Sequence, residues 1–99
     1  MIARYWRGLA KSSFANAYIE HLHTETFPQL ANLPGFVNVL ILRRELGDGT
    51  EFLIVTVWES REAIARFSGP DIETAVVPEK VQSLMIEYDA HARHYEIVV

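Results

Sequence analysis

Two segments of the chain would carry apolar side chains on both faces if each formed a β-strand. In a β-strand, successive side chains point to opposite sides of the sheet. Residues 52–58 therefore present two apolar sets: Phe52, Ile54 and Trp58 on one face, and Leu53, Val55 and Val57 on the other. Residues 36–42, Phe-Val-Asn-Val-Leu-Ile-Leu, repeat this pattern. The few helices that fit into 99 residues cover one face of such a sheet, so we expect a second copy of the chain to cover the other.

The hydrophobic pattern around these segments predicts further strands and helices. In chain order, the expected elements are a strand over residues 2–9, a helix over about 12–25, strands over 36–46 and 50–58, helices after Ser60 and Pro78, and a last strand over 91–98. Gly47-Asp48-Gly49 indicates a hairpin between the second and third strands, because glycine tolerates positive φ. The order βαββαβ predicts an α+β, ferredoxin-like fold with an antiparallel four-stranded sheet, in a single domain over residues 1–99.

Capping residues and helix breakers indicate where the predicted helices begin and end. Ser12-Ser13 and Ser60 are expected N-caps. Because proline lacks the backbone N–H, either a kink or a fresh short turn is expected at Pro28, with Leu30 and Leu33 packing that turn down. Pro78 is expected at the first position of a short last helix. The buried side of that helix is predicted to contain Val81, Leu84 and Met85.

Charge and composition narrow the range of partners. The chain has nine basic and thirteen acidic residues, a net charge of −4, and a single adjacent basic pair, Arg43-Arg44. Without a basic stripe, binding to nucleic acid or to a membrane surface is not expected. The absence of cysteine excludes disulfides and thiolate chemistry and fits a cytoplasmic location. No apolar run has the length of a membrane-spanning helix, and the N-terminus lacks a signal-peptide pattern.

Two aromatic residues are candidates for ligand contacts. Trp58 ends the third strand, where the sheet leads into a helix. It is either a core aromatic with its indole N–H bonded to a neighbour, or the wall of a pocket that stacks on a flat ligand. Tyr18 projects from the first helix toward the sheet, and it is either a core residue with a tethered hydroxyl or a pocket residue.

The histidines are candidates for acid–base chemistry rather than for metal binding. His21 and His23 are two residues apart on a helix, so their side chains diverge. The odd spacing of His91 and His94 puts them on opposite faces of a strand. His21, near the sheet-facing stripe, is either a semi-buried structural histidine or a base. His94 and Tyr95 belong either to a dimer contact or to a pocket, in which His94 is the base and Tyr95 contacts the substrate.

Several local motifs occur together in this chain. They are Leu-Pro-Gly-Phe at 33–36, Leu-Arg-Arg at 42–44, Ile-Val-Thr-Val-Trp-Glu-Ser at 54–60, Ala-Ile-x-x-Phe at 63–67 and His-Tyr-Glu-Ile-Val at 94–98. With these motifs the chain resembles the antibiotic biosynthesis monooxygenase domain, a family of dimeric α/β barrels, along nearly its whole length. The resemblance implies a homodimer whose two sheets pack face to face, and a pocket between each sheet and its own helices.

The resemblance also implies two kinds of activity. One branch of the family oxidises aromatic polyketides with O₂ and no cofactor, and places Trp, Tyr, Asn, Arg and His around a quinol-like substrate. The positions of this chain that fit such roles are Trp58, Tyr18, His21 and His94. The haem-degrading branch uses an Asn of the first strand, a Trp at the end of the third and a His of the following helix. Trp58 matches that Trp, but the first strand contains no Asn and residues 59–77 contain no His.

Three functions are compatible with these observations. The first is a small cofactor-independent monooxygenase that acts on an aromatic or quinol-like molecule, with His21 or His94 as the base and with neither metal nor cofactor. Its expected substrate contacts are Trp58, Tyr18 and Tyr95. The second is a non-catalytic dimeric module that binds a small ligand such as haem or a quinone, because a fold alone does not assign an activity. The third is an isomerase-like or stress-response barrel of the same shape.

Overall fold

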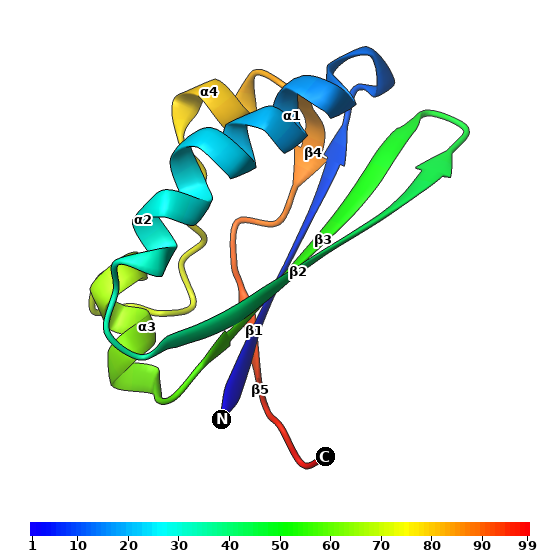
Figure 1. The fold of residues 1–99 in the computed structure, drawn as a ribbon. Coiled ribbons are helices and arrows are strands. Elements are labelled where there is room, and N and C mark those ends of the chain that lie inside the picture. The colour runs from blue at the N-terminus through cyan, green and yellow to red at the C-terminus, as the bar shows by residue number, and fades with distance from the viewer.

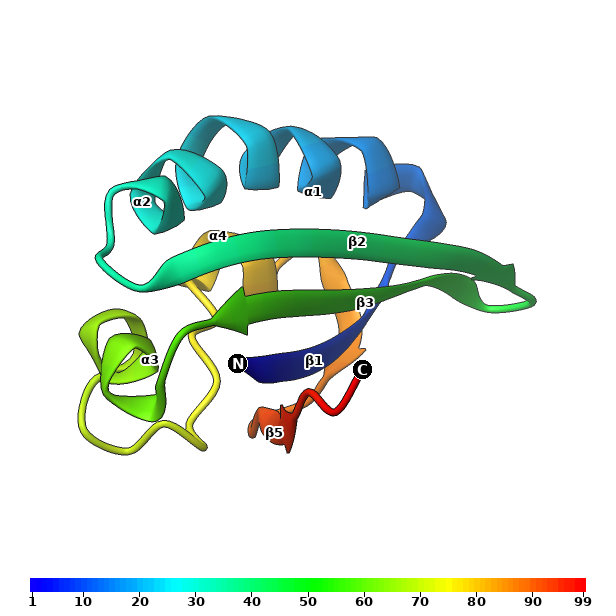
Figure 2. The same ribbon diagram turned by 60° about the horizontal axis from the view of Figure 1, so that its bottom comes forward.

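The structure is a computed structural model that describes residues 1–99, and it confirms the expected α+β, ferredoxin-like fold. Its strands are β1 (Ile2–Ala10), β2 (Phe36–Leu46), β3 (Gly49–Trp58), β4 (Met85–Tyr88) and β5 (Arg93–Glu96). All pairings are antiparallel, in the order β2-β3-β1-β4, and β5 also pairs with β1. The helical segments gather on one side of this sheet, and the other side is bare (Figures 1 and 2).

Two short strands share the fourth position of the sheet. β4 pairs with β1 at Gly8–Ala10, and β5 pairs with the same strand at Ile2–Tyr5. The single last strand expected over residues 91–98 is therefore shorter than predicted, and a further strand precedes it. Met85, which was expected on a helix, begins β4 and is nevertheless buried. A four-residue strand contains too few alternations for its period to be recognised in the sequence.

The first helical layer continues past Pro28 as a short new helix, in which Leu30 is buried. A 3₁₀ turn (Ser12–Phe14) leads into α1 (Ala15–His21), a π-helical turn (Leu22–Thr26) and α2 (Phe27–Ala31). Of the two alternatives expected at Pro28, the fresh short turn is the one observed: the N–H of Phe27 bonds to the carbonyl of Leu22, and the proline falls in the first turn of α2. The π-helical turn thus places Pro28 in the first turn of α2, where a backbone N–H would have no acceptor within that helix.

The remaining helices are short, and their ends test the predicted caps. In α3 (Arg61–Ser68), Ser60 is the N-cap, and its Oγ accepts a hydrogen bond from the N–H of Ala63 at 3.1 Å, as predicted. Ser12 caps nothing, because its hydroxyl contacts Thr50 and Glu45 instead. Pro78 is the N-cap of α4 (Glu79–Gln82) rather than its first residue. None of these helices has the length and apolar character needed to cross a bilayer.

The alternation of β3 is confirmed by burial. Its helix-facing residues are buried, namely Phe52, Ile54, Thr56 and Trp58. Phe52 and Ile54 pack with Tyr18 and Leu22 of the first helical layer, whereas Trp58 packs with Leu30 and the buried residues of α3. The sheet's covered face therefore has two apolar clusters, one under α1 and one between α2 and α3.

The opposite face of the sheet, which we call the outer face, keeps much of its apolar surface exposed. It carries Tyr5 of β1, Leu40 and Leu42 of β2, Leu53 and Val55 of β3, and Tyr95 of β5. Leu40 is 52% exposed and Leu42 is 48% exposed. No helix of this chain lies over this face of the sheet (Figure 2).

Glu51 closes one end of the outer face with an ion-pair cluster. Its carboxylate accepts hydrogen bonds from Nε of Arg44 at 2.6 Å and from Nε of Arg7 at 2.7 Å. These bonds, that from Arg44 above all, hold the pKa of the Glu51 carboxyl below its usual value. The side chain of Glu51 is buried. The chain thus places a carboxylate between two arginines on this face.

The turn before β2 generates the first prediction. Gly35 has φ of +89°, and a Cβ there would lie 2.5 Å from the Cβ of Ala63 in α3. We expect Gly35→Ala to lower the unfolding free energy by about 1–3 kcal/mol, because it adds left-handed strain to a steric clash. Gly47→Ala is the matched control, since its added Cβ meets nothing within 4 Å. Urea denaturation of both variants measures the difference, and equal losses would contradict the stated role of Gly35.

Candidate active site

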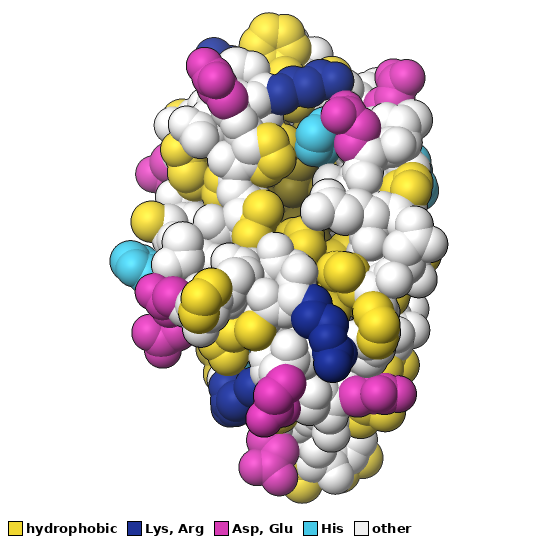
Figure 3. Space-filling view, turned by 90° about the vertical axis from the view of Figure 1, so that its left-hand side faces the viewer, with side chains coloured by type: hydrophobic (Ala, Val, Ile, Leu, Met, Phe, Trp, Pro, Cys, Tyr) yellow, Lys and Arg dark blue, Asp and Glu magenta, His cyan; other side chains and the backbone are white.

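A cavity lies between the covered face of the sheet and the helical layer. Its volume is about 70 Å³, and eight of its thirteen lining residues are hydrophobic. Seen from the side on which the helices lie, hydrophobic side chains gather around a hollow in the middle of the molecule (Figure 3). The polar groups that reach this cavity are few, and they come from β1, from β3, from α1 and from the π-helical turn.

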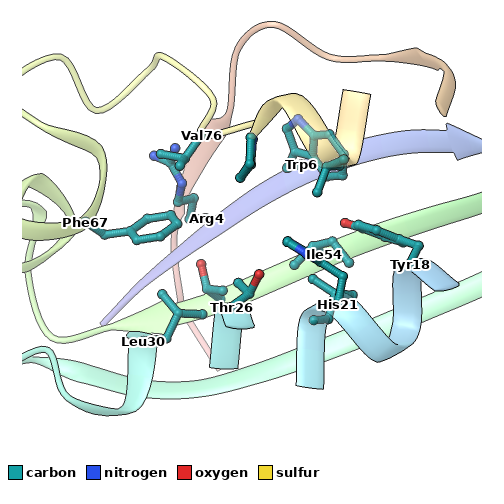
Figure 4. Close-up of a pocket in the computed structure, with 13 residues that line it drawn as sticks. Arg4, Trp6, Tyr18, His21, Thr26, Leu30, Ile54, Phe67 and Val76 are labelled. Carbon is teal, nitrogen blue, oxygen red and sulfur yellow. The ribbon is translucent and has the colours of Figure 1, made fainter. Parts of the chain in front are cut away.

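α1 supplies a tyrosine and a histidine one turn apart. Tyr18 and His21 are three residues apart and therefore lie on the same side of the helix, where both are buried and point toward the cavity (Figure 4). The Tyr18 ring also packs edge-on against Phe52, with centroids 4.9 Å apart. Hydrophobic packing of the ring thus directs the hydroxyl end of Tyr18 toward the cavity.

The imidazole of His21 is held by a carboxylate one turn further along the chain. Its Nδ1 lies 3.0 Å from Oε2 of Glu25, and the same oxygen accepts a hydrogen bond from Nζ of Lys80 at 2.9 Å. Lys80, from α4, holds the pKa of the Glu25 carboxyl below its usual value, with a smaller contribution from His21. An anionic Glu25 favours the tautomer with the proton on Nδ1, which leaves the lone pair of Nε2 available.

Two hydroxyl groups at the cavity form no hydrogen bond with any other group of the protein. The Tyr18 hydroxyl forms no hydrogen bond within the chain, and burial raises its pKa, so it remains protonated at neutral pH. Thr26 lines the cavity from the π-helical turn, and its hydroxyl is also unpaired within the chain. Such turns occur often at functional sites, because they move one residue out of the regular helical register. Both hydroxyls are thus available to a ligand.

Arg4 brings a buried positive charge to the other end of the cavity. Its side chain points from β1 into the covered face, where it lies beside Phe67 of α3 (Figure 4). Nη1 bonds to the carbonyl oxygen of Ile72 and lies 2.9 Å from Nε2 of His94, and Nη2 donates to the carbonyl oxygen of Thr74 at 3.0 Å. Burial lowers the pKa of this guanidinium, but an arginine keeps its charge in proteins.

The structure brings together only two of the five residues predicted for the site. Tyr18 and His21 line the cavity. Trp58 is completely buried below it, stacked on Phe67, and its indole N–H donates to Oγ1 of Thr56 at 2.8 Å. This is the core alternative considered for Trp58.

His94 and Tyr95 lie elsewhere on β5. His94 lies on the far side of the Arg4 guanidinium and lines a separate open groove with Arg61 and Glu73. Tyr95 is on the outer face, 52% exposed, and packs edge-on against Tyr5 at 6.5 Å. Neither side chain is therefore among the residues that line the cavity.

Sequence reasoning missed Arg4, Glu25 and Thr26. For Glu25 a signal existed, because it follows His21 by four residues and such pairs meet on a helix surface. A weaker signal existed for Arg4, which shares one face of the first strand with the apolar residues Ile2 and Trp6. An arginine on the covered face of a strand is unusual enough to suggest a role. Thr26 carried no signal, because its place depends on the π-helical turn.

Comparison with known proteins identifies the family. The fold is that of a small α+β domain with a cavity between one sheet face and its helices. The sequence profile of the family "Antibiotic biosynthesis monooxygenase" matches residues 3–76. The chain therefore belongs to the antibiotic biosynthesis monooxygenase family. A search of curated proteins finds no match.

Solved structures with the same fold include enzymes of two kinds. SnoaB, a cofactor-independent oxygenase from Streptomyces nogalater, is 20% identical, with a TM-score of 0.67 and coverage of 97% of this chain and 91% of that one. A Streptomyces coelicolor monooxygenase in complex with nanaomycin D is 18% identical, with a TM-score of 0.68 and coverage of 95% and 84%. The haem degrader MhuD of Mycobacterium tuberculosis, with two haems bound, is 22% identical, with a TM-score of 0.60 and coverage of 100% and 97%.

The contact between Arg4 and His94 generates the second prediction. Burial lowers the pKa of His94 below its ordinary 6.5, and the charges of Arg4 and Arg61 add to this against a smaller opposing effect of Glu73. Between the two pKa values the unfolded chain takes up a proton that the folded chain does not, so folding stability falls as pH decreases below about 6.5. We expect His94→Gln to lose less unfolding free energy than wild type between pH 7.5 and 5.

Urea denaturation across that range checks this expectation. The control is His91→Gln, a histidine two residues before β5 that is exposed and makes no side-chain hydrogen bond in the structure. Carboxylates titrate in all three proteins, so only the difference between the profiles reports on His94. Parallel profiles for wild type and His94→Gln would show that the histidine protonates freely in the folded protein.

Proposed function

We propose that this protein is a cofactor-independent oxygenase that acts on a compact phenolic or quinol-like aromatic molecule in the cavity. The observation that carries the proposal is the pairing of His21 with Glu25 beside the unpaired Tyr18 hydroxyl, inside an apolar cavity. A base, a hydrogen-bond donor and an apolar pocket are the groups that such a reaction needs. Family membership and a fold shared with SnoaB support the assignment.

In the proposed reaction, Nε2 of His21 removes a phenolic proton from the substrate. Glu25 stabilises the imidazolium that forms and keeps the ring oriented. The deprotonated ring gives one electron to O₂, and the resulting radical and superoxide combine to form a carbon–oxygen bond. The imidazolium of His21 returns its proton to the peroxide anion. Loss of water from the hydroperoxide, with the hydrogen of the same ring carbon, then leaves a carbonyl, so that one oxygen atom enters the product and the other enters water. Tyr18, which burial keeps protonated, donates a hydrogen bond to the oxygen anion that develops.

The size of the cavity limits the substrate. At about 70 Å³ it is about half the size of the roughly 150 Å³ cavity that admits benzene in an engineered protein core, and far below the roughly 300 Å³ of a small-molecule site. Its walls must therefore separate when an aromatic ring enters. The cost of that separation grows with the ligand, which favours a molecule of one or two rings over a haem.

The third prediction concerns His21. With a naphthoquinol as substrate, and with autoxidation subtracted, we expect His21→Ala to lower protein-dependent oxygen uptake by about 100-fold or more, because the base is lost. Glu25→Gln should give an intermediate rate, because the imidazole keeps a neutral partner but loses the anion. The matched control is His23→Ala, an exposed histidine on the same helical layer. Oxygen-electrode rates check this, and a fully active, folded His21→Ala would remove the base assignment.

The alternative is a module that binds haem or a quinone without turning it over. The observation that favours it is the placement of Trp58 and His94 outside the cavity, which leaves a smaller catalytic set than the relatives imply. Titration with haem or with menadione, followed by visible absorbance, measures binding. Saturable binding by a sample that consumes no oxygen with any quinol would favour the module over the enzyme.

We further propose that two copies of the chain associate through the outer face. Its exposed leucines and partly exposed valines form an apolar surface over which no helix of the chain lies (Figure 2), and a dimer would bury about 600–800 Å² per subunit there. The Arg7–Glu51–Arg44 cluster closes one end of this surface with compensated charge. Face-to-face packing of two sheets would leave both cavities on the outside of the dimer.

The fourth prediction tests this association. Val55→Asp should convert a dimer into a monomer or an unfolded chain, because a buried, unpaired carboxylate costs several kcal/mol. Gln29→Asp, which adds the same charge to an exposed position on α2, should leave the mass unchanged. Light scattering at micromolar concentration measures both variants. A wild-type mass of one subunit would refute the proposed association.

A further inference from the structure

Arg4 is a buried cation for which the chain provides no anion. Only 5% of its surface is exposed, and no carboxylate lies within ion-pair distance of its guanidinium. The arginines of the outer face differ, because Arg7 and Arg44 both contact Glu51. Buried charges in proteins are normally paired, since an uncompensated one is costly to remove from water.

The groups around Arg4 satisfy hydrogen bonds without neutralising its charge. They are the carbonyl oxygens of Ile72 and Thr74, the imidazole of His94 and the face of the Phe67 ring, whose centroid lies 6.0 Å from Cζ. The His94 nitrogen that meets the guanidinium must be an acceptor, so this ring is neutral. A guanidinium has five N–H groups, and these three acceptors engage three of them. Two N–H groups therefore remain for a ligand.

The position of Arg4 gives the cavity two chemically different ends. Arg4 and Phe67 lie at one end, and Tyr18 and His21 lie at the other (Figure 4). The apolar side chains of Ile54 and Leu30 line the space between the two ends. A ligand that fills the cavity thus meets a fixed positive charge at one end and a base with a hydroxyl donor at the other.

We propose that Arg4 binds the carboxylate of an aromatic acid, and that the natural ligand is a hydroxylated aromatic carboxylic acid. A planar carboxylate matches two N–H groups of a guanidinium, and the pairing is stronger in an apolar cavity than in water. The ring of such an acid lies between the two ends, with its hydroxyl toward His21. The inference rests on the proposed function for the role of His21, but the anion site itself depends only on Arg4.

Equilibrium binding tests the proposal without any turnover. The probes are two acids of different size, 4-hydroxybenzoate and 6-hydroxy-2-naphthoate, each compared with its uncharged amide by calorimetry. We expect the wild-type protein to bind at least one acid ten or more times more tightly than the matching amide. In Arg4→Met this preference should disappear while the affinity for the amide is retained, and Arg4→Lys should keep part of it.

Controls separate this effect from general electrostatics and from misfolding. Arg43→Met removes the same charge from an exposed position and should leave the preference unchanged. Because Arg4 also holds the carbonyls of Ile72 and Thr74, circular dichroism must show that Arg4→Met is folded. If it is not, the wild-type comparison of acid and amide, together with Arg4→Lys, decides the question. Equal affinities for acid and amide in the wild type, or no binding of either acid at millimolar concentration, would overturn the proposal.

Two further outcomes distinguish this inference from the proposed function. Inorganic phosphate that competes with the acid supports the anion site, and tighter binding of phosphate than of either acid overturns the aromatic acid as ligand. Rapid, His21-dependent oxidation of neutral quinols without any preference for acids would keep the oxygenase and remove the role of Arg4. A strong preference for acids in a protein that oxidises no quinol would keep the anion site and remove the oxygenase.

Discussion

The structure depends on the packing of one layer of helices against one face of a five-stranded sheet. This layer buries the alternate residues of β3 and ties α1, α2 and α3 to the sheet through two apolar clusters. It leaves a small cavity where the clusters meet the polar groups of β1 and α1. The same arrangement leaves the outer face bare, with Leu40 and Leu42 half exposed. The cavity and the proposed interface are thus two results of one constraint.

Charge is distributed differently on the two faces of the sheet. On the outer face, Glu51 lies between Arg7 and Arg44, and the cluster is compensated. On the covered face, Arg4 is surrounded by carbonyl oxygens, a neutral imidazole and an aromatic ring. At the far end of the cavity, the charges of Glu25 and Lys80 orient His21. A cavity with a fixed cation at one end and an oriented base at the other suits a ligand that carries an anionic group at one end and an acidic hydroxyl at the other.

Local patterns predicted most of the fold and a minority of the site. The period of two in β3, the glycine hairpin and the Ser60 cap all depend on residues close in sequence, and all are confirmed. In β2 the period holds from Asn38 onward, but a bulge between Phe36 and Asn38 breaks it at the start of the strand. The π-helical turn and β4 were missed. The turn depends on how α1 and α2 pack on the sheet, and β4 is too short to show a period. Tyr18 and His21 were placed correctly near the sheet because helical spacing alone put them on its side.

The sequence by itself determined the antiparallel fold, the two-faced apolar strands and the helix face that carries Tyr18 and His21. These features repeat over intervals of two to four residues, and such intervals are visible in a linear chain. Only the tertiary structure decided that Trp58 is core, that His94 lies behind Arg4 and that Arg4 has no anion. The contacts of Arg4 reach residues 68, 70 and 90 positions away, and Lys80 reaches Glu25 across 55. No local period connects such residues, because the folding of the whole sheet and its helices brings them together.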